Sequence, residues 1–513
     1  MVADRLLRIS THMEVVTGLH KTVIVVGSGF GGIGMGAALR RAGMDDFLIL
    51  EESPELGGVW RDNTYPGCSC DVPAHLYSFS FAPYRDARTR FPGRRRTLEY
   101  LRTVAAEAGL PAHLHTGAAV VAATYSDRDA RWELLTANGI RYTAEIVVFA
   151  VGQLHRPNIP DFPGRDEFCG ASFHTADWDH AVDLRGRRIA LIGNGSSAAQ
   201  CLPHLADKAA SVRIFQRTPQ WILPKPSADF GPAARAILRL PGAQRIYRRT
   251  LQWGADALLV PIMRRGWPAR PAQWCARQYL RRSVSDPDLR ARLTPDYPIG
   301  AKRILFDNHF YRSLARAHVD LVTTSIARIT PGGIDTADGA HHSADVIVYA
   351  TGFRASEFLA PITVRGRNGR LLSDEWRSGA SAFMGLAVPG FPNVFLLAGP
   401  NSFNPAGSNP TMKEYQIDFI LRCLRWRQQI GAAAVEVRPE AMAAYREWLD
   451  RALAGTVWSA QVPNWYRHDS GAVTNPWPAS ARTFARMLRR PPASSFASVT
   501  GSVAGDPAPA VRM

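Results

Sequence analysis

Two glycine-rich turns are the clearest chemical signal in this sequence. Each lies between an apolar strand pattern, Thr22–Val26 or Arg188–Ile192, and a helix pattern. Glycines let backbone N–H groups approach a pyrophosphate, and the following helix presents its positive end to the phosphates. The sequence therefore predicts two dinucleotide sites. Their turn residues are Gly27, Gly29, Phe30, Gly31 and Gly32 in the first turn, and Gly193, Gly195, Ser196, Ser197 and Ala198 in the second.

The residues that end the second strand of each unit indicate which nucleotide is bound. In the first unit the strand Phe47–Leu50 ends at Glu51, 24 residues after Gly27, and an acid there accepts a hydrogen bond from a ribose hydroxyl. In the second unit a strand over residues 211–216 ends at Arg217 and Thr218. A cation at that place fits a 2′-phosphate and favours NADP over NAD. The alternative is that Arg217 is one more surface arginine.

Two dinucleotide sites in one chain imply electron transfer between two nucleotides, most simply from NADPH to FAD. Flavoprotein disulfide reductases share this plan, but they need a C-x-x-C motif beside the flavin. The nearest pair here, Cys68 and Cys70, has C-x-C spacing. The sequence argues against that class, and we expect no metal site.

The composition of the 513-residue chain is that of a globular protein of two to four domains. The net charge is +17, and only five of the 61 basic residues are lysines. Because the arginines are dispersed and no recognition motif accompanies them, we expect no nucleic-acid partner.

No apolar run reaches the roughly 18 residues of a membrane span. With no secretory signal pattern, we expect a cytoplasmic protein.

The order of the patterns predicts an α/β fold in which the second dinucleotide unit is inserted within the first. An internal echo supports this, because residues 144–152 resemble residues 344–352 and each follows a turn signal. Residues 224–298 have a helical pattern and are rich in arginine and tryptophan. Their apolar run Ala257–Met263 makes contact with a membrane surface a second, less favoured interpretation of this segment. The expected boundaries are a loose arm at 1–20, the first unit at 21–155 and 336–490, the second unit with the helical insertion at 156–335, and a disordered tail at 491–513.

The segment between the two units carries a family resemblance. Residues 168–179 match the fingerprint F-x-G-x-x-x-H-x-x-x-W-[P/D] at every fixed position, through Phe168, Gly170, His174 and Trp178. In this the sequence resembles the type I Baeyer–Villiger monooxygenases, which are class B flavoprotein monooxygenases of the flavin-containing monooxygenase superfamily. The likeness extends over roughly residues 20–490. Other matching segments are Gly57–Trp60, Tyr65–Gly67, Cys70–Asp71, Tyr77–Phe81, Gly300–Arg303, Asp345–Gly352, Asn464–Tyr466 and Trp477–Pro478.

The resemblance implies two Rossmann-like domains, one for FAD and one for NADP, and an NADPH-dependent monooxygenase activity. Such an enzyme inserts one oxygen atom from O₂ into a small, apolar ketone through a flavin peroxide, giving an ester or a lactone. NADP⁺ is retained during turnover. The alternatives are a sulfur- or nitrogen-oxygenating flavin monooxygenase of the same fold and an uncoupled NADPH oxidase.

The resemblance also implies residue roles. Arg303 is the active-site cation, and Asp71 pairs with it and also lies in the cofactor site. Lys302 joins Arg217 and Thr218 at the 2′-phosphate. The fingerprint residues act in domain coupling. Further cofactor contacts are expected at Gly58, Trp60, Tyr77, Thr351, Gly352 and Trp465. One departure is the loop Gly399–Asn409, which differs from that of many relatives and leaves the substrate and regiochemistry open.

Overall fold

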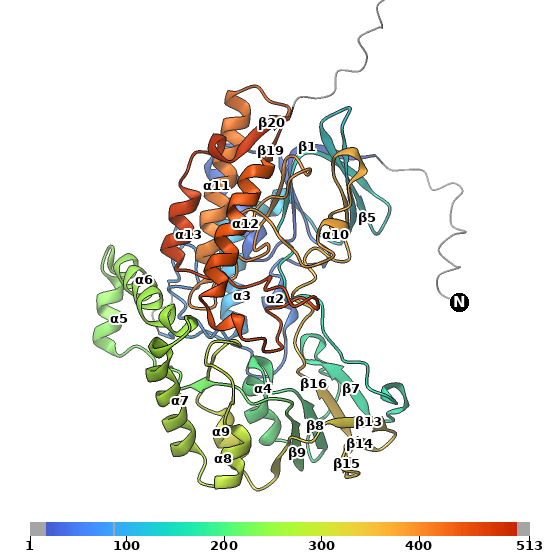
Figure 1. The fold of residues 1–513 in the computed structure, drawn as a ribbon, viewed down its shortest axis with the longest axis vertical. Helices are drawn as coiled ribbons and strands as arrows, with labels where there is room; N and C mark the ends of the chain where they lie inside the picture. Colours follow the sequence, from blue (N-terminus) through green and yellow to red (C-terminus); the bar gives the residue numbers. More distant parts are fainter. Residues whose placement is uncertain (1–16, 86–87, 500–513) are drawn as a thin grey trace, which may run out of the picture.

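The computed structural model describes residues 17–85 and 88–499. Two sheets with parallel cores form the body of the molecule, one in the upper and one in the lower half of Figure 1. Helices pack against both of them, and a helical segment from the middle of the chain projects at the left. The α/β class with two Rossmann-like cores, expected from the sequence, is confirmed.

The first sheet holds the first glycine turn at the carboxyl end of its central strand. Strand β1 (Thr17–Val26) pairs in parallel with β2 (Phe47–Leu50) on one side and β6 (Arg141–Phe149) on the other. Strand β2 matches its predicted limits, whereas β1 begins five residues earlier than predicted. The remaining strands of this sheet are β3 (Leu114–His115), β4 (Val120–Ser126), β5 (Arg131–Thr136), β17 (Thr363–Arg365) and β18 (Val394–Leu396).

Helices from both ends of the chain cover the first sheet. Helix α1 (Phe30–Arg41) starts directly after the glycine turn and packs along α11 (Asn409–Gln429). Its buried residues join the largest apolar core of the molecule, to which Met412, Ile420 and Phe484 also belong. The other helices around this unit are α2 (Val59–Asp62), α3 (Arg94–Glu107), α10 (Leu372–Glu375), α12 (Pro439–Ala454) and α13 (Ala481–Leu488).

The second sheet repeats the plan around the second turn. Its strand order is β12-β9-β8-β16-β7, with every neighbouring pair parallel. The strands are β7 (Ala171–His174), β8 (Arg188–Ile192), β9 (Ser211–Phe215), β12 (Val319–Val322) and β16 (Val346–Tyr349). Helix α4 (Ser196–Ala206) follows the turn and packs on α9 (Phe310–Leu314).

An antiparallel meander accompanies each sheet, as the internal echo suggested. Strands β4, β5 and β6 form the first, with Gly139 in the turn before β6. The second consists of β13 (Ile326–Thr330), β14 (Gly333–Thr336) and β15 (His341–Ser343), with Gly339 in its last turn. Strand β6 is both the last meander strand and a core strand, whereas in the second unit β15 ends and β16 then begins as a separate strand.

Residues 224–298 are mainly helical, as the sequence indicated. The segment contains α5 (Pro232–Arg239), α6 (Ala243–Gly254), α7 (Arg270–Ser283) and α8 (Pro287–Leu293), with short helical turns between α6 and α7. Strands β10 (Ile222–Leu223) and β11 (Leu305–Phe306) pair with each other where the segment leaves and rejoins the second unit. Among the described residues, no helix combines the length and apolarity that crossing a membrane requires.

The structure differs from the expected boundaries at two places. Residues 336–352, expected in the second part of the first unit, belong with the second sheet, because β16 hydrogen-bonds to β8 and β7. Residues 496–499, expected in the disordered tail, form β20 (Phe496–Val499), which pairs with β19 (Ala434–Val437). Phe496 is buried against Phe395 and Phe419, so its apolar side chain explains this order. Most of the predicted arm and the end of the tail lie outside the described residues.

Candidate active site

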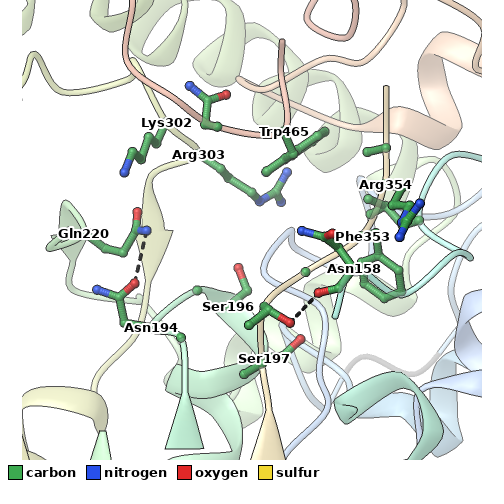
Figure 2. Close-up of a pocket in the computed structure, with 18 of the residues that line it drawn as sticks. Asn158, Asn194, Ser196, Ser197, Gln220, Lys302, Arg303, Phe353, Arg354 and Trp465 are labelled. Atoms are coloured by element: carbon green, nitrogen blue, oxygen red, sulfur yellow. Dashed lines mark hydrogen bonds between the residues drawn. The ribbon is translucent and has the colours of Figure 1, made fainter. Parts of the chain in front are cut away.

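A cleft with a volume of about 1270 Å³ lies between the two units and receives residues from both. The second glycine turn forms one wall, and the segment carrying Lys302 and Arg303 enters from the opposite side, beside Trp465 (Figure 2). The predicted site residues that line the cleft are Trp60, Asp71, Tyr77, Gly193, Gly195, Ser196, Ser197, Arg217, Thr218, Lys302, Arg303, Thr351, Gly352 and Trp465.

The other predicted residues lie outside the lining of this cleft. They are Gly27, Gly29, Phe30, Gly31, Gly32, Glu51, Gly58, Ala198 and the four fingerprint residues. The Phe30 side chain packs into the core, with its ring centroid 5.0 Å from that of Tyr77. Any contact of Phe30 with a cofactor would therefore be through its backbone.

An ion pair between Arg303 and Asp71 stands in the cleft. The Arg303 guanidinium donates to one Asp71 carboxylate oxygen through Nη2 at 2.6 Å and Nε at 3.2 Å. Only about a quarter of the Arg303 side chain and a fifth of the Asp71 side chain are exposed. Burial by itself raises the pKa of Asp71, but the charge and hydrogen bonds of Arg303, aided by Lys225, outweigh it and lower that pKa. Asp71 in turn raises the pKa of Arg303, so both groups stay charged.

Backbone anchors hold the two partners of this pair. Lys225 donates from Nζ to the carbonyl oxygen of Cys70 at 3.0 Å, directly before Asp71. Asn464 donates from Nδ2 to the carbonyl oxygen of Ala301 at 3.1 Å, two residues before Arg303. The Trp458 indole N–H donates to the Gly300 carbonyl oxygen at 3.0 Å. The anchors fix both chain segments, so the guanidinium is held in place before any ligand arrives.

The cysteines near this pair do not add a reactive group. Burial raises the pKa of Cys68 to about 11 and also raises that of Cys70, so both remain thiols at neutral pH. This agrees with their C-x-C spacing, which does not suit a redox pair.

The first glycine turn has the geometry of a dinucleotide cradle. Gly27 has a φ of +98°, and a Cβ there would lie 2.9 Å from the carbonyl oxygen of Ala150. A Cβ at Gly32 would lie 1.8 Å from the carbonyl oxygen of Gly27, so α1 can approach β1 this closely only with a glycine. The N-terminus of α1 begins at Gly29 without a side-chain cap. Its backbone donors therefore suit the pyrophosphate of FAD.

Glu51 is tied into this turn. One carboxylate oxygen accepts from the backbone N–H and hydroxyl of Ser28, at 2.8 and 2.6 Å. The other accepts from Arg61 at 2.9 Å and from the Ser53 N–H at 3.1 Å. Both carboxylate oxygens of Glu51 therefore already accept hydrogen bonds. The predicted contact with a ribose hydroxyl requires the hydroxyl to share one of these oxygens with its present donor, or that donor to move.

The second turn adjoins a cationic corner that suits a phosphate. Lys302 donates to the hydroxyl of Thr218, and Arg217 lines the same cleft. Burial and, to a lesser extent, the like charge of Arg217 lower the pKa of Lys302 to about 8, with Asp296 opposing them. Two cations and a hydroxyl that converge beside a helix N-terminus are a donor set for an anion, and they fit the 2′-phosphate of NADP.

The residue inside the second turn reaches the end of β9. Asn194 donates from Nδ2 to Gln216 Oε1 and to the Thr218 carbonyl oxygen, both at 2.8 Å. Gln220 approaches Asn194 from the other side at 3.4 Å (Figure 2). Asn194, Gln216 and Gln220 were absent from the sequence prediction, although the x position of a G-x-G turn was a signal for Asn194.

The fingerprint residues lie at the second sheet rather than in the cleft. A Cβ at Gly170 would lie 2.3 Å from the Asp345 carbonyl oxygen, which explains the glycine. His174 ends β7, accepts from the Ala176 N–H at 3.0 Å and packs edge-on against Phe353. Burial lowers the pKa of His174 to about 4, so the imidazole is neutral. Trp178 packs against Phe173 in the core of the second unit.

Two segments that cross between the sheets are joined to each other. The Asn158 N–H donates to the Gly352 carbonyl oxygen at 2.9 Å, and the Thr351 hydroxyl donates to the Asn158 carbonyl oxygen at 2.5 Å (Figure 2). Phe353 lies on this crossing and touches both His174 and the cleft. The sequence prediction included Thr351 and Gly352 but missed Asn158 and Phe353. Their spacing in the sequence does not indicate that the chain crosses between the two sheets at these residues.

The divergent loop Gly399–Asn409 reaches the cleft through two residues that the sequence prediction did not assign to the site. Phe403 lies with its ring centroid 5.5 Å from the Arg303 guanidinium and 5.0 Å from the ring of Trp465. Asn409 begins α11 and also lines the cleft. The Ser-Asn-Pro signature of a helix start was the signal available for Asn409.

Comparisons with known proteins agree with this site. A family model described as pyridine nucleotide-disulphide oxidoreductase matches residues 24–240. A Baeyer–Villiger monooxygenase of Streptomyces coelicolor is 39% identical over 478 residues, covering 92% of this chain and 91% of the relative. One of Pseudomonas aeruginosa is 35% identical, covering 96% of this chain and 94% of the relative.

Solved structures give the same result. An oxidised steroid monooxygenase bound to NADP matches with a TM-score of 0.84 and 28% identity, over 94% of this chain and 99% of the other. A closed cyclohexanone monooxygenase matches with a TM-score of 0.84 and 27% identity, over 94% and 100% of the two chains. The protein is an NADPH-dependent flavoprotein monooxygenase with FAD and NADPH as its cofactors, and the chain belongs to the Baeyer–Villiger monooxygenase family.

Proposed function

We propose that this enzyme inserts one oxygen atom of O₂ beside the carbonyl group of a small, apolar ketone and forms an ester or a lactone. The observation that carries the proposal is the Arg303–Asp71 pair, a permanent cation held in the cleft between the two units. The cyclohexanone and steroid monooxygenases among the structural relatives make a ketone the natural first substrate.

Arg303 is the proposed catalytic cation. Negative charge develops on a ketone oxygen when its carbonyl carbon is attacked, and a fixed guanidinium stabilises that charge without reorganising. Asp71 orients the guanidinium and leaves its remaining N–H donors for a ligand. The ring of Phe403 beside Arg303 provides an apolar surface where a ketone can rest and water is excluded.

The proposed arrangement of the cofactors follows from the two cradles. FAD would be held by the first turn through Gly27–Gly32, Glu51 and Gly58, and Trp60 and Tyr77, which line the cleft, would contact it there. When bound, NADPH supplies a hydride and reduced FAD supplies the electrons that activate O₂, so the second oxygen atom leaves as water.

NADP occupies the second turn in the proposed arrangement. Arg217, Thr218 and Lys302 would hold its 2′-phosphate, and Thr351, Gly352 and Trp465, which line the same cleft, would contact the rest of the nucleotide. With NADP⁺ retained during turnover, the nucleotide fills part of the cleft and helps to exclude water.

The fingerprint residues are proposed to couple the two units rather than to touch substrate. His174 packs edge-on against Phe353, which lies on the crossing between the sheets and lines the cleft. A shift of the second unit would therefore reach the cleft through this contact.

The test is product formation by purified, FAD-loaded enzyme supplied with NADPH, O₂ and either cyclohexanone or a steroid ketone. We expect the ester or lactone in proportion to the NADPH consumed. Arg303→Ala should lower product formation by about 10²–10³-fold, because one preorganised charge contact is lost. It should still oxidise NADPH and release the oxygen as peroxide.

The matched control is Arg354→Ala, which removes another arginine of the cleft lining, one paired with Glu357 at 3.7 Å. Ester formation should persist in this variant. Full ester formation by Arg303→Ala would contradict the proposed role of Arg303. Oxygenation of methyl phenyl sulfide without any ketone product would favour the heteroatom alternative, and stoichiometric peroxide with every substrate would favour an oxidase.

A further inference from the structure

The helical segment 232–283 carries an unusual concentration of exposed apolar side chains. Eleven large apolar side chains are exposed among the described residues, and seven of them fall within this tenth of the chain. The three tryptophans among them are 62, 74 and 63% exposed. The seven residues, which we call the apolar flank, are Ile237, Leu240, Ile246, Trp253, Leu258, Trp267 and Trp274.

The same segment holds most of the excess positive charge of the protein. Residues 232–283 contain eleven arginines, no lysine and a single acid, Asp256, for a net charge of +10 out of +17. Nine of these arginines are exposed, and none of the nine forms an ion pair within the described part of the chain. They are Arg239, Arg245, Arg249, Arg264, Arg265, Arg270, Arg277, Arg281 and Arg282. The charge is therefore concentrated on this flank rather than dispersed.

Apolar and basic side chains alternate along the same helix faces. Trp267, Arg270, Trp274, Arg277 and Arg281 succeed one another at intervals of three and four residues, which places them on one side of α7 and the turn before it. Ile246, Arg249 and Trp253 follow the same spacing on α6. Each exposed face thus offers rings and aliphatic chains with guanidinium groups between them.

The opposite face of the segment is anchored to the body of the enzyme, so the apolar flank must face outward. Arg248, the partly buried arginine of α6, donates to the Ser78 carbonyl oxygen at 2.6 Å and pairs with Glu414 at 3.1 Å. Asp256, the only acid, accepts from the Ala481 N–H at 3.1 Å. The two carboxylates at this segment, Glu414 and Asp256, are therefore both engaged in these inward contacts. The segment stands at the left edge of the molecule in Figure 1.

We propose that this flank docks the enzyme on the surface of an anionic lipid bilayer. Tryptophan is enriched at the boundary between headgroups and acyl chains, and arginine reaches lipid phosphates while its stem stays apolar. Amphipathic helices with large apolar residues and a basic polar face lie in that boundary. The proposal is independent of the substrate proposed for the cleft.

Two other occupants fit the flank less well. In a dimer with a twofold axis through this flank, the nine arginines of one copy would face the nine arginines of the other. Their charges would repel, because the flank has no acid to pair with them. A nucleic acid would match the charge and could stack on the tryptophans, but Ile237, Leu240, Ile246 and Leu258 offer no ring to a base. Of these three occupants, the bilayer surface is the one that uses the aliphatic, aromatic and basic groups together.

The test is co-sedimentation of the full-length, FAD-loaded enzyme with vesicles of phosphatidylcholine, with and without phosphatidylglycerol. We expect binding that requires phosphatidylglycerol and weakens with salt. Substituting Trp253, Trp267 and Trp274 together by Ser should lower the partition coefficient about tenfold or more. Substituting Arg249, Arg270 and Arg281 together by Gln should lower it roughly a hundredfold, since each basic group near the surface contributes about 1 kcal/mol.

The matched control replaces exposed side chains elsewhere, in the triple variant Leu19→Ser, Ile430→Ser and Arg377→Gln, which should bind vesicles like the parent. FAD content and NADPH oxidation by all variants show that they are folded.

The proposal is overturned if the parent does not bind anionic vesicles, or if the tryptophan variant binds them as well as the parent. A parent dimer that the tryptophan variant dissociates, without vesicle binding, would assign the flank to a second copy. Binding to an oligonucleotide as tight as to the vesicles would assign it to a nucleic acid.

Discussion

The two dinucleotide units share a backbone plan and differ in charge at one equivalent place. In each turn the residue between the first two glycines, Ser28 or Asn194, hydrogen-bonds to the residue that follows the second strand. That partner is the carboxylate of Glu51 in the first unit and the amide of Gln216 in the second. Arg217 then follows Gln216, and Lys302 arrives beside it. One cradle is acidic where a ribose diol is expected, and the other is cationic where a phosphate is expected.

The two units also differ in how closely helix and strand pack. Gly32 in α1 and Ala198 in α4 hold the same place in their turns, yet a Cβ at Gly32 would overlap the Gly27 carbonyl oxygen, whereas the methyl group of Ala198 is fully buried. Helix α1 must therefore approach its strand more closely than α4 does. The shared backbone plan explains why both units have the sequence pattern of a dinucleotide site. The differences in charge and in helix packing are the features by which the two units would bind different nucleotides.

The largest expected effect comes from exchanging the residues at this packing position. Gly32→Ala should abolish FAD binding and destabilise the first unit by about 3 kcal/mol, because the added methyl group forces α1 away from β1. Ala198→Gly should cost only about 0.5–1 kcal/mol, as expected for glycine in a helix, and should leave FAD binding intact. Flavin absorbance per mole of protein and thermal unfolding measure both. Equal losses in the two variants would contradict the difference in packing.

Removing the cation of the second unit should have the next largest effect. Arg217→Ala should raise the KM for NADPH by roughly 10- to 100-fold, because a hydrogen bond to a charged group contributes about 1.5–3 kcal/mol. The KM for NADH, which has no 2′-phosphate, should change little. Arg213→Ala, which removes a nearby arginine close to Asp320, is the control. A parallel rise in both KM values would place Arg217 away from the 2′-phosphate.

The pH dependence of NADPH use should show the lowered pKa of Lys302. A lysine loses its charge as the pH rises through its pKa, so attraction for the phosphate is present below about pH 8 and is lost above it. We expect kcat/KM for NADPH to fall by roughly three- to tenfold between about pH 8 and pH 9. Lys302→Arg should abolish the fall, since arginine stays charged. A fall of the same size with NADH would exclude Lys302 as its source.

The smallest effect is expected where the two units are made alike. Gln216→Glu gives the second unit the acid of the first, and the added charge should repel a 2′-phosphate. We expect the preference for NADPH over NADH to decrease about threefold. The change also removes the donor to the Arg292 carbonyl oxygen at 2.9 Å, so Gln216→Met, which removes that donor without adding charge, is the control. The ratio of kcat/KM values for the two coenzymes is the measurement, and an identical shift in the control would show that charge is not the cause.

Much of the fold could be predicted because its signals are local. Strands β2 and β8 lie within their predicted limits, since each is a short apolar run that ends at a turn or an acid. The pairing of Arg303 with Asp71 joins residues 232 positions apart, and it was anticipated only through the family resemblance. Lys225 and Asn464 were missed as anchors because they act on backbone carbonyls, which have no sequence signature.

The sequence by itself determined the two cradles and the charge difference between Glu51 and Arg217. These depend on glycine geometry and on residue types next to one another in the chain, so they can be read locally. Only the tertiary structure decided which distant residues share the cleft and which face of segment 232–283 remains uncovered. The inward contacts of Arg248 and Asp256 leave the tryptophans and most of the arginines outward, and these contacts are a property of the packed chain that composition does not contain.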